Sequence, residues 1–291
     1  MSEWSTRLPP TLRSCGTMTA MSLQKVAAVG RAPAPPAVPV GTENPRRARR
    51  LAWLYEVAII AVGYAFYSWI RNLVTAREGE AVHRAQRLVE LEKTLGIYHE
   101  RAVNHFVAGH HWLAYASNYY YATVHFAVTI AAGVWIYRRH PEYARPLRSA
   151  WYAMNVAGLF GFAFLALAPP RLLPGGRFVD TVVEFHTWGS WGDQSVSSHS
   201  NQYAAMPSMH IGWSAWVGLA VVALATRRGV RLIGALYPFV TLFVIIGTGN
   251  HFFLDAVGGL VALGAGFLVV RVVSCRRVLP PLRKPARPAA D

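Results

Sequence analysis

Two residues suited to covalent catalysis lie in the segment GTGNHFFLDAVGG (Gly247–Gly259), at the start of a long apolar stretch. His251 and Asp255 are four residues apart, and on a helix this spacing places both side chains on one face. The carboxylate can then accept a hydrogen bond from one imidazole nitrogen and leave the other nitrogen free to attack. Asn250 suits an N-cap, which predicts His251 in the first helical turn. Such ionisable groups usually mark a functional site, although the polar end of a membrane helix can also simply reach water.

A second histidine, His210, ends the segment PSMH (Pro207–His210), which precedes another apolar stretch. Pro207 suits the first position of a helix, and this predicts Ser208 and His210 in the first turn. The exposed N–H groups of a helix N-terminus favour anions such as phosphate. A third segment, PPR, ends in Arg171, whose planar guanidinium matches phosphate oxygens. Taken together, these residue types suit phosphoryl transfer.

The composition indicates that the elements carrying these residues are membrane helices. Of the 291 residues, 53% are hydrophobic, and the mean hydropathy is +0.25. The apolar residues fall into blocks of about twenty, the length that a bilayer-spanning helix needs. The net charge of +15 comes from arginines clustered between these blocks, as membrane topology requires, so it does not indicate nucleic acid. The sequence therefore predicts an all-α, polytopic membrane bundle with about six transmembrane helices.

The basic clusters also predict the topology, because they favour the cytoplasmic side. Both termini are expected in the cytoplasm, with residues 1–45 as a disordered tail, 46–275 as the membrane domain and 276–291 as a basic tail. Arg138, Arg139, Arg145 and Arg148 are expected to form a cytoplasmic loop. The first three expected crossings run from Leu51 to about Leu73, from Trp112 to about Tyr137, and from the cytoplasmic loop to about Ala168. The fourth runs from Pro207 to about Ala225, the fifth continues to about Gly247, and the sixth runs from His251 to about Val273.

The segment 75–111 is too polar for the bilayer core, and its pattern predicts an amphipathic helix on the outer membrane surface. Gly96 is expected to end this helix. The apolar positions at helical spacing are Ala81, Val82, Ala85, Leu88, Val89 and Leu95. The five histidines of the region have no metal-ligand spacing, so no metal site is predicted there; they are His83, His99, His105, His110 and His111.

In the second crossing, Asn118, Tyr121 and His125 share one helical face. They can line a headgroup pocket or form hydrogen bonds to neighbouring helices, and the second interpretation is favoured. In the predicted topology, the end of the third crossing and the starts of the fourth and sixth all meet at the outer face. The candidate site on that face therefore comprises Arg171, Ser208, His210, His251 and Asp255.

The segments PPRLLP, AAMPSMHIGW and GNHFFLDAVGG resemble motifs of the type 2 phosphatidic acid phosphatase superfamily, and within it the inositol phosphorylceramide synthase-like branch. The segment FVDT (Phe178–Thr181) fits as well, and the resemblance covers residues from about 50 to 275. It implies a membrane enzyme that acts on phosphate esters of lipids without a metal or other cofactor. By the same resemblance, His251 is the nucleophile that forms a phosphohistidine, Asp255 orients it, and His210 protonates the leaving oxygen. Arg171 and the region of Ser208 hold the phosphate.

The chain departs from the superfamily pattern at two cationic positions. Phe164 stands where the first motif, KxxxxxxRP, has its lysine, and Leu172 replaces the proline of that motif. Ile245 stands where the third motif has its arginine, and the SGH of the second motif is Ser208–His210 here. The choice between monophosphate and diphosphate, and between water and a hydroxyl acceptor, therefore stays open.

Two other functions fit the same residues. Two histidines and one carboxylate can form a metal triad with open positions, which would make the protein a metal-dependent membrane hydrolase. The same His and Asp side chains can also serve as an intramembrane relay in a lipid transporter. The polar residues, however, lie at one face rather than at the midplane, and no internal repeat is visible. An integral membrane lipid-phosphate phosphatase or phosphotransferase is therefore the preferred prediction, with a lipid phosphate and the bilayer as its partners and a multi-pass cell-membrane location.

Overall fold

The computed structural model describes residues 78–175, 177–187, 202–274 and 277–280, together with residues 54, 55, 57, 58, 61–63, 65 and 69. The chain divides into two compact units, Met1–Val57 and Ala58–Asp291. In the first unit only three residues are described, and all are helical: Leu54, Tyr55 and Val57. The predicted disordered tail, most of the first crossing and most of the basic C-terminal tail lie outside the described residues. The second unit contains all the other described residues.

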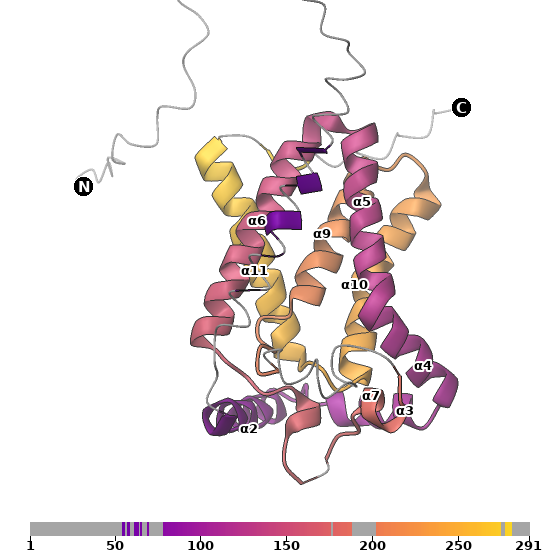
Figure 1. Ribbon diagram of the computed structural model, residues 1–291, viewed down its shortest axis with the longest axis vertical. Coiled ribbons are helices and arrows are strands. Elements are labelled where there is room, and N and C mark those ends of the chain that lie inside the picture. The colour runs from indigo at the N-terminus through magenta and orange to yellow at the C-terminus, as the bar shows by residue number, and fades with distance from the viewer. Residues whose placement is uncertain are drawn as a thin grey trace, which may run out of the picture. The chain divides into compact units, whose positions relative to one another are not determined.

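This unit is all-α, as the sequence predicts (Figure 1). Within its described residues, extended pairing is limited to one isolated bridge between Leu167 and Ala204. The helices are α2 (Glu78–Thr94), α3 (Glu100–Ala108), α4 (His111–Tyr119), the π-helix η2 (Tyr120–Val124), α5 (His125–Arg139), α6 (Pro141–Phe164), the 3₁₀ turn η3 (Pro170–Leu172), α7 (Thr181–Glu184), α9 (Met209–Leu224), α10 (Arg228–Gly247) and α11 (Phe253–Ser274).

Three segments of the described chain are long and apolar enough to cross a membrane: His111–Arg139, Arg228–Gly247 and Phe253–Ser274. The first is the continuous run α4–η2–α5, and the other two are α10 and α11. The helix α9 is equally apolar but shorter, with 16 residues. These helices make the protein an all-α membrane bundle, while the total of six crossings stays a prediction.

The predicted cytoplasmic loop between the second and third crossings is wrong in detail. Helix α5 ends at Arg139 and α6 begins at Pro141, so His140 alone connects them. Proline favours the first turn of a helix because its missing N–H needs no partner there. Arg145 and Arg148 therefore belong to α6 and not to a loop.

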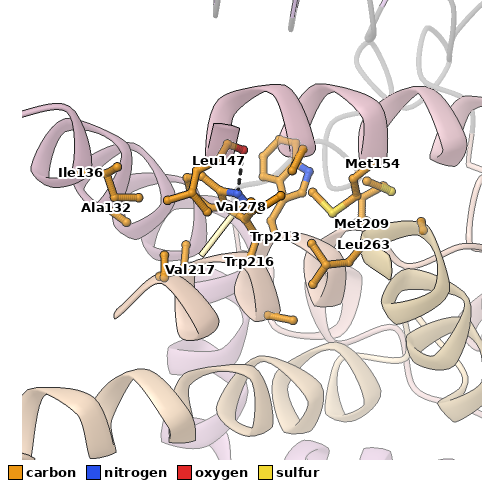
Figure 2. Packing of buried hydrophobic residues seen from close by; sticks show 14 of the residues in the cluster. Ala132, Ile136, Leu147, Met154, Met209, Trp213, Trp216, Val217, Leu263 and Val278 are labelled. Atoms are coloured by element: carbon orange, nitrogen blue, oxygen red, sulfur yellow. Dashed lines mark hydrogen bonds between the residues drawn. The ribbon is translucent and has the colours of Figure 1, made fainter. Parts of the chain in front are cut away.

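The main core lies where α6, α9 and α11 meet (Figure 2). Trp216 of α9 donates its indole N–H to the backbone carbonyl of Leu147 in α6, at 3.0 Å. One turn earlier, Trp213 donates to the side-chain oxygen of Asn155, at 3.1 Å. A buried indole N–H needs such an acceptor, so these two bonds fix how α9 lies against α6.

Glycines let α11 approach both neighbours closely. A Cβ atom at Gly259 would collide with the backbone carbonyl of Ser208, just before α9. A Cβ atom at Gly266 would come 2.5 Å from the backbone oxygen of Ala150 in α6. Small residues allow such backbone contacts between membrane helices. The start of α11 is therefore in direct contact with the start of α9.

The predicted amphipathic segment forms the helix α2, which lies across one end of the bundle (Figure 1), while its place on the outer membrane surface stays a prediction. It ends next to Gly96, whose φ of +71° suits glycine at a helix C-terminus. Its apolar face packs on protein, because Ala81, Ala85 and Val89 are buried in a cluster with Phe252 and other residues. The helix is thereby joined to the segment between α10 and α11.

Candidate active site

The segment between α10 and α11 holds His251 outside both helices. Gly249, with a φ of +71°, ends α10, and the N–H groups of Asn250 and His251 both donate to the carbonyl of Ile245, at 3.1 and 3.2 Å. Helix α11 begins only at Phe253. The prediction of Asn250 as an N-cap and of His251 in the first helical turn is therefore wrong, because their backbone groups complete the end of α10.

The predicted pair of His251 and Asp255 nevertheless forms. The Nδ1 atom of His251 lies 3.3 Å from Oδ2 of Asp255, and the same oxygen accepts the backbone N–H of Phe252 at 2.9 Å. His251 is 5% exposed and Asp255 is fully buried. A carboxylate at Nδ1 favours the tautomer in which Nδ1 carries the proton and Nε2 has the free lone pair. This geometry suits a nucleophilic histidine.

The start of α9 lies beside this pair. The backbone N–H of Ser208 donates to the carbonyl of Asp255, at 2.9 Å. Ser208 is the N-cap of α9, and its backbone is extended with φ −71° and ψ 102°. The prediction that Pro207 begins the helix is therefore wrong, since α9 starts at Met209 and His210 is its second residue. The hydroxyl of Ser208 is buried and has no hydrogen-bond partner in the described part of the chain.

His210 faces His251 across the site, with ring centroids 5.7 Å apart. Its other ring neighbours come from the second crossing: Tyr121 stacks on it at 4.3 Å, and His125 lies at 4.9 Å. Tyr121 belongs to the π-helix η2. Short π-helical segments inside α-helices often occur at functional sites, since they redirect one side chain.

The structure separates the three polar residues that share a face of the second crossing. Asn118 donates to the backbone carbonyl of Thr181 and to the side-chain hydroxyl of Thr187, both at 2.9 Å. The Nδ1 atom of His125 lies 3.1 Å from the hydroxyl of Tyr237. These two residues fit the favoured interpretation of bonds between helices, whereas Tyr121 lines the site.

Arg171 is anchored at the edge of the same site. Its backbone N–H donates to the carbonyl of Gly249, its Nε donates to Oδ1 of Asn250 at 3.0 Å, and its Nη1 donates to Oδ2 of Asp180 at 3.1 Å. The side chain is 3% exposed. Asp180 also caps α7 by accepting the N–H groups of Val182 and Val183. The guanidinium is therefore held in one orientation next to the residue that precedes His251.

Two buried carboxyl groups at the start of α11 were not expected from the sequence. Glu100 of α3 accepts the backbone N–H of Phe253 at 3.0 Å, and Glu92 of α2 accepts that of Leu254 at 2.8 Å. Both are fully buried. Burial and the neighbouring carboxyl group of Glu100 raise the pKa of Glu92 to about 9. One signal was available: Glu92 continues the buried stripe of Ala81, Ala85 and Val89 at helical spacing.

The histidines of the 75–111 region have other roles in the structure. The Nε2 atom of His105 lies 3.2 Å from the carbonyl of Arg177, and Nδ1 of His110 lies 2.7 Å from that of Phe106. Across the residues that the structure describes, no three His, Cys, Asp or Glu side chains are grouped closely enough to hold a metal ion. The candidate site therefore consists of two histidines, carboxyl groups and an arginine.

The fold and the site define a membrane protein with a helical bundle and a cluster of two histidines, an arginine and buried carboxyl groups at one end. A family model described as PAP2 superfamily matches residues 86–269, and the chain belongs to this superfamily. The match includes α9, α10 and most of α11, and so all of the candidate site. It makes the protein a phosphatase or phosphotransferase of the phosphoric ester kind. No curated protein and no solved structure gives a significant match.

The two positions where cations of the superfamily motifs are replaced lie in different surroundings. Phe164, at the end of α6, is 70% exposed. Ile245 is fully buried in α10, and its carbonyl binds the backbone of His251. Neither position supplies a charge to the site, so Arg171 is the one guanidinium or ammonium group among the predicted site residues.

Proposed function

We propose that the protein is an integral membrane lipid-phosphate phosphatase or phosphotransferase that acts through a phosphohistidine intermediate. The observation that carries this proposal is the placement of His251, oriented by Asp255, opposite His210 at a ring distance of 5.7 Å. A nucleophile, its orienting carboxylate and a separate acid are the parts that two-step displacement needs.

In the first step, Nε2 of His251 attacks phosphorus, and the bond from phosphorus to the lipid oxygen breaks. His210 in its protonated form gives its proton to that oxygen. In the second step, water or a hydroxyl group attacks the phosphohistidine, while His210 accepts the proton of the attacking group. His251 is then neutral again and His210 is protonated, so both residues are ready for another cycle.

Arg171 and Ser208 are proposed to hold the phosphate during both steps. The hydrogen bonds to Asn250 and Asp180 hold the guanidinium of Arg171 next to the residue that precedes His251. Ser208 adds a buried hydroxyl at the start of α9, where backbone N–H groups favour an anion. Both residues position the phosphate for attack and stabilise the charge that develops on it.

The substrate class is proposed to be a lipid phosphate with its headgroup at the outer membrane face. The arginine clusters favour a cytoplasmic location for both termini. In that topology the start of α9, with His210, and the segment before α11, with His251, would lie outside. The resemblance to the inositol phosphorylceramide synthase-like branch supports headgroup transfer to a polyol hydroxyl as well as hydrolysis.

The test is to incubate the purified protein with a panel of lipid phosphates and to follow phosphate release and headgroup transfer separately. Activity should be inhibited by vanadate and should persist in EDTA, and an acid-labile phosphoenzyme should accumulate after rapid quenching. Activity that is lost with EDTA and restored by a divalent ion would instead support a metal-dependent hydrolase. Turnover without any phosphoenzyme would contradict the covalent route.

The orientation has its own test, because the chain contains two cysteines, Cys15 and Cys275, one towards each terminus. A membrane-impermeant thiol reagent should leave both unlabelled in intact cells and should label them after permeabilisation. Labelling of either residue in intact cells would move the site to the cytoplasmic face.

A further inference from the structure

The first backbone N–H groups at the start of α11 are bound by three different carboxyl groups. Phe252 donates to Asp255, which is one turn further along the chain. Phe253 donates to Glu100 of α3, and Leu254 donates to Glu92 of α2. The last two acceptors are 153 and 162 residues away in sequence. Two separate helices thus reach across the end of the bundle to hold the residues that follow His251.

The two glutamates cannot both be charged at low cost in this place. Each is fully buried, and each uses one oxygen for α11 while the second oxygen has no partner among the described residues. A buried carboxylate without a counter-charge is costly, and a second carboxylate beside it raises that cost. One proton held between the two carboxyl groups removes one charge and turns one unpaired oxygen into a donor to the other.

We propose that Glu92 and Glu100 are positioning residues that share one proton and lock the first turn of α11, so that His251 and Asp255 keep their geometry for attack. The catalytic part of this inference rests on the proposed function, whereas the shared proton can be measured without any activity. Neither glutamate touches the reacting atoms, since both act through the backbone of Phe253 and Leu254.

Acidic groups face Glu92 from two other helices and favour its protonated form. Glu100 faces Glu92 from α3, and Asp255 faces it from α11, and both are negative or potentially negative. Tyr98, in the connection between α2 and α3, interacts with Glu100 and with the positive Lys93, and burial raises the pKa of its hydroxyl. Burial, Glu100 and Asp255 together raise the pKa of Glu92 to about 9, against the lowering effect of the hydrogen bond from the backbone N–H of Leu254.

A raised pKa makes the stability of the folded protein depend on pH in a defined direction. Between pH 4.5, the ordinary pKa of a glutamate, and about 9, the folded protein keeps a proton on Glu92 that the unfolded chain has lost. The contribution of this proton to stability is complete below pH 4.5 and decreases as the pH rises through 9. In detergent, the unfolding temperature should therefore fall between pH 4.5 and about 9, because the folded protein gradually loses the advantage of the proton on Glu92.

The variant Glu92→Gln tests this directly, because glutamine is a permanent copy of the protonated acid. Its carboxamide oxygen can accept from Leu254, and its NH₂ group can donate to Glu100. The fall in unfolding temperature with pH should become shallower, and turnover of a short-chain phosphatidate at pH 7 should stay within about threefold of the original. The matched control is Glu90→Gln, on the same helix but exposed and paired with Lys93; it should keep the original pH dependence.

A second variant, Glu92→Leu, removes the acceptor for Leu254 without changing the side-chain length greatly. Loss of the positioning should lower kcat about 100-fold while KM changes little, because the phosphate-holding residues are untouched. An unchanged pH dependence of the unfolding temperature in Glu92→Gln would overturn the shared proton. A Glu92→Leu variant that folds and keeps its kcat would overturn the positioning role. If the original protein turns over no phosphate ester while Glu92→Gln still has the shallower dependence, the proposed function fails and the shared proton stands.

Discussion

The helices α9 and α11 both begin at the candidate site, but they differ in whether carboxyl groups bind their first backbone N–H groups. At α11, three carboxyl groups bind the backbone N–H groups of residues 252–254. At α9, the first turn contains no acidic residue, and the N-cap Ser208 makes no capping hydrogen bond with its side chain. The first N–H groups at α11 therefore have carboxyl acceptors, whereas the N-cap side chain of α9 supplies none.

This difference indicates how the site divides its work. A phosphate group at the start of α11 would meet carboxyl oxygens already bound there and would be repelled. At the start of α9 it would meet helix N–H groups and a hydroxyl with no protein partner in the described chain. Carboxyl groups of the protein thus hold the segment that follows His251, whereas the start of α9 keeps a buried hydroxyl without a partner in the described chain, as the proposed anion site requires.

The comparison is tested most severely by removing the nucleophile. The variant His251→Ala should lose turnover by about 10⁴-fold or more on every substrate, because the proposed phosphoryl acceptor is removed. Both a short-chain phosphatidate and an aryl phosphate should be affected equally, and no phosphoenzyme should form. Substantial turnover of either substrate would show that the covalent step does not take place at His251.

Replacing the histidine of α9 should have a smaller effect that depends on the substrate. A lipid alkoxide is a poor leaving group, so His210→Ala should slow lipid turnover by roughly 10²–10⁴-fold. A nitrophenolate leaves without a proton, so the same variant should keep much of its activity on an aryl phosphate that the protein accepts. Initial rates on both substrates measure the difference, and equal losses would contradict the role of His210 as the acid.

The contact between the two helix starts can be changed without touching a site side chain. In Gly259→Ala, the new methyl group would collide with the backbone carbonyl of Ser208, so the helices must move apart. We expect a loss of about 1–3 kcal/mol in the free energy of unfolding and a lower kcat. Gly264→Ala is the control, since a methyl group there meets no atom within 4 Å; it should keep both properties. A fully active Gly259→Ala would mean that the spacing of the helix starts is unimportant.

The smallest expected effect concerns the hydroxyl at the start of α9. Because the Ser208 hydroxyl is buried without a partner in the described chain, Ser208→Ala should leave stability unchanged or raise it by up to about 1 kcal/mol. The same variant should raise KM several-fold if the hydroxyl binds phosphate. Thermal unfolding and substrate titration measure the two effects. A destabilised variant with normal KM would assign Ser208 to structure.

The sequence predicted the long-range part of the site better than its local details. Alternating basic clusters placed three distant segments at one end of the bundle, and the structure brings Arg171, His210 and His251 together there. Helix boundaries were less accurate, since the backbone of His251 completes the end of α10 and its position depends on Gly249. A local pattern cannot show which of two adjoining helices will use a given N–H group.

The carboxyl groups from α2 and α3 could be suspected from the sequence but not assigned. An acid on an apolar stripe, as at Glu92, signals a buried polar contact. Its partner is the N–H of Leu254, a backbone group that carries no mark in the sequence. Likewise, the π-helix that brings Tyr121 onto His210 arises from packing and not from a composition that distinguishes it from the α-helix on either side.

The backbone contact between Gly259 and Ser208 affects how the helix bundle can adapt to the thickness of a bilayer. Side chains can change rotamers when helices shift, but two main chains in contact have no such freedom. Membrane helices tilt to match bilayers of different thickness. A backbone contact near one end limits how far the starts of α9 and α11 can separate as the bundle tilts, so the two histidines should keep their separation. We therefore expect catalysis to tolerate changes in lipid chain length that visibly alter the tilt of the bundle.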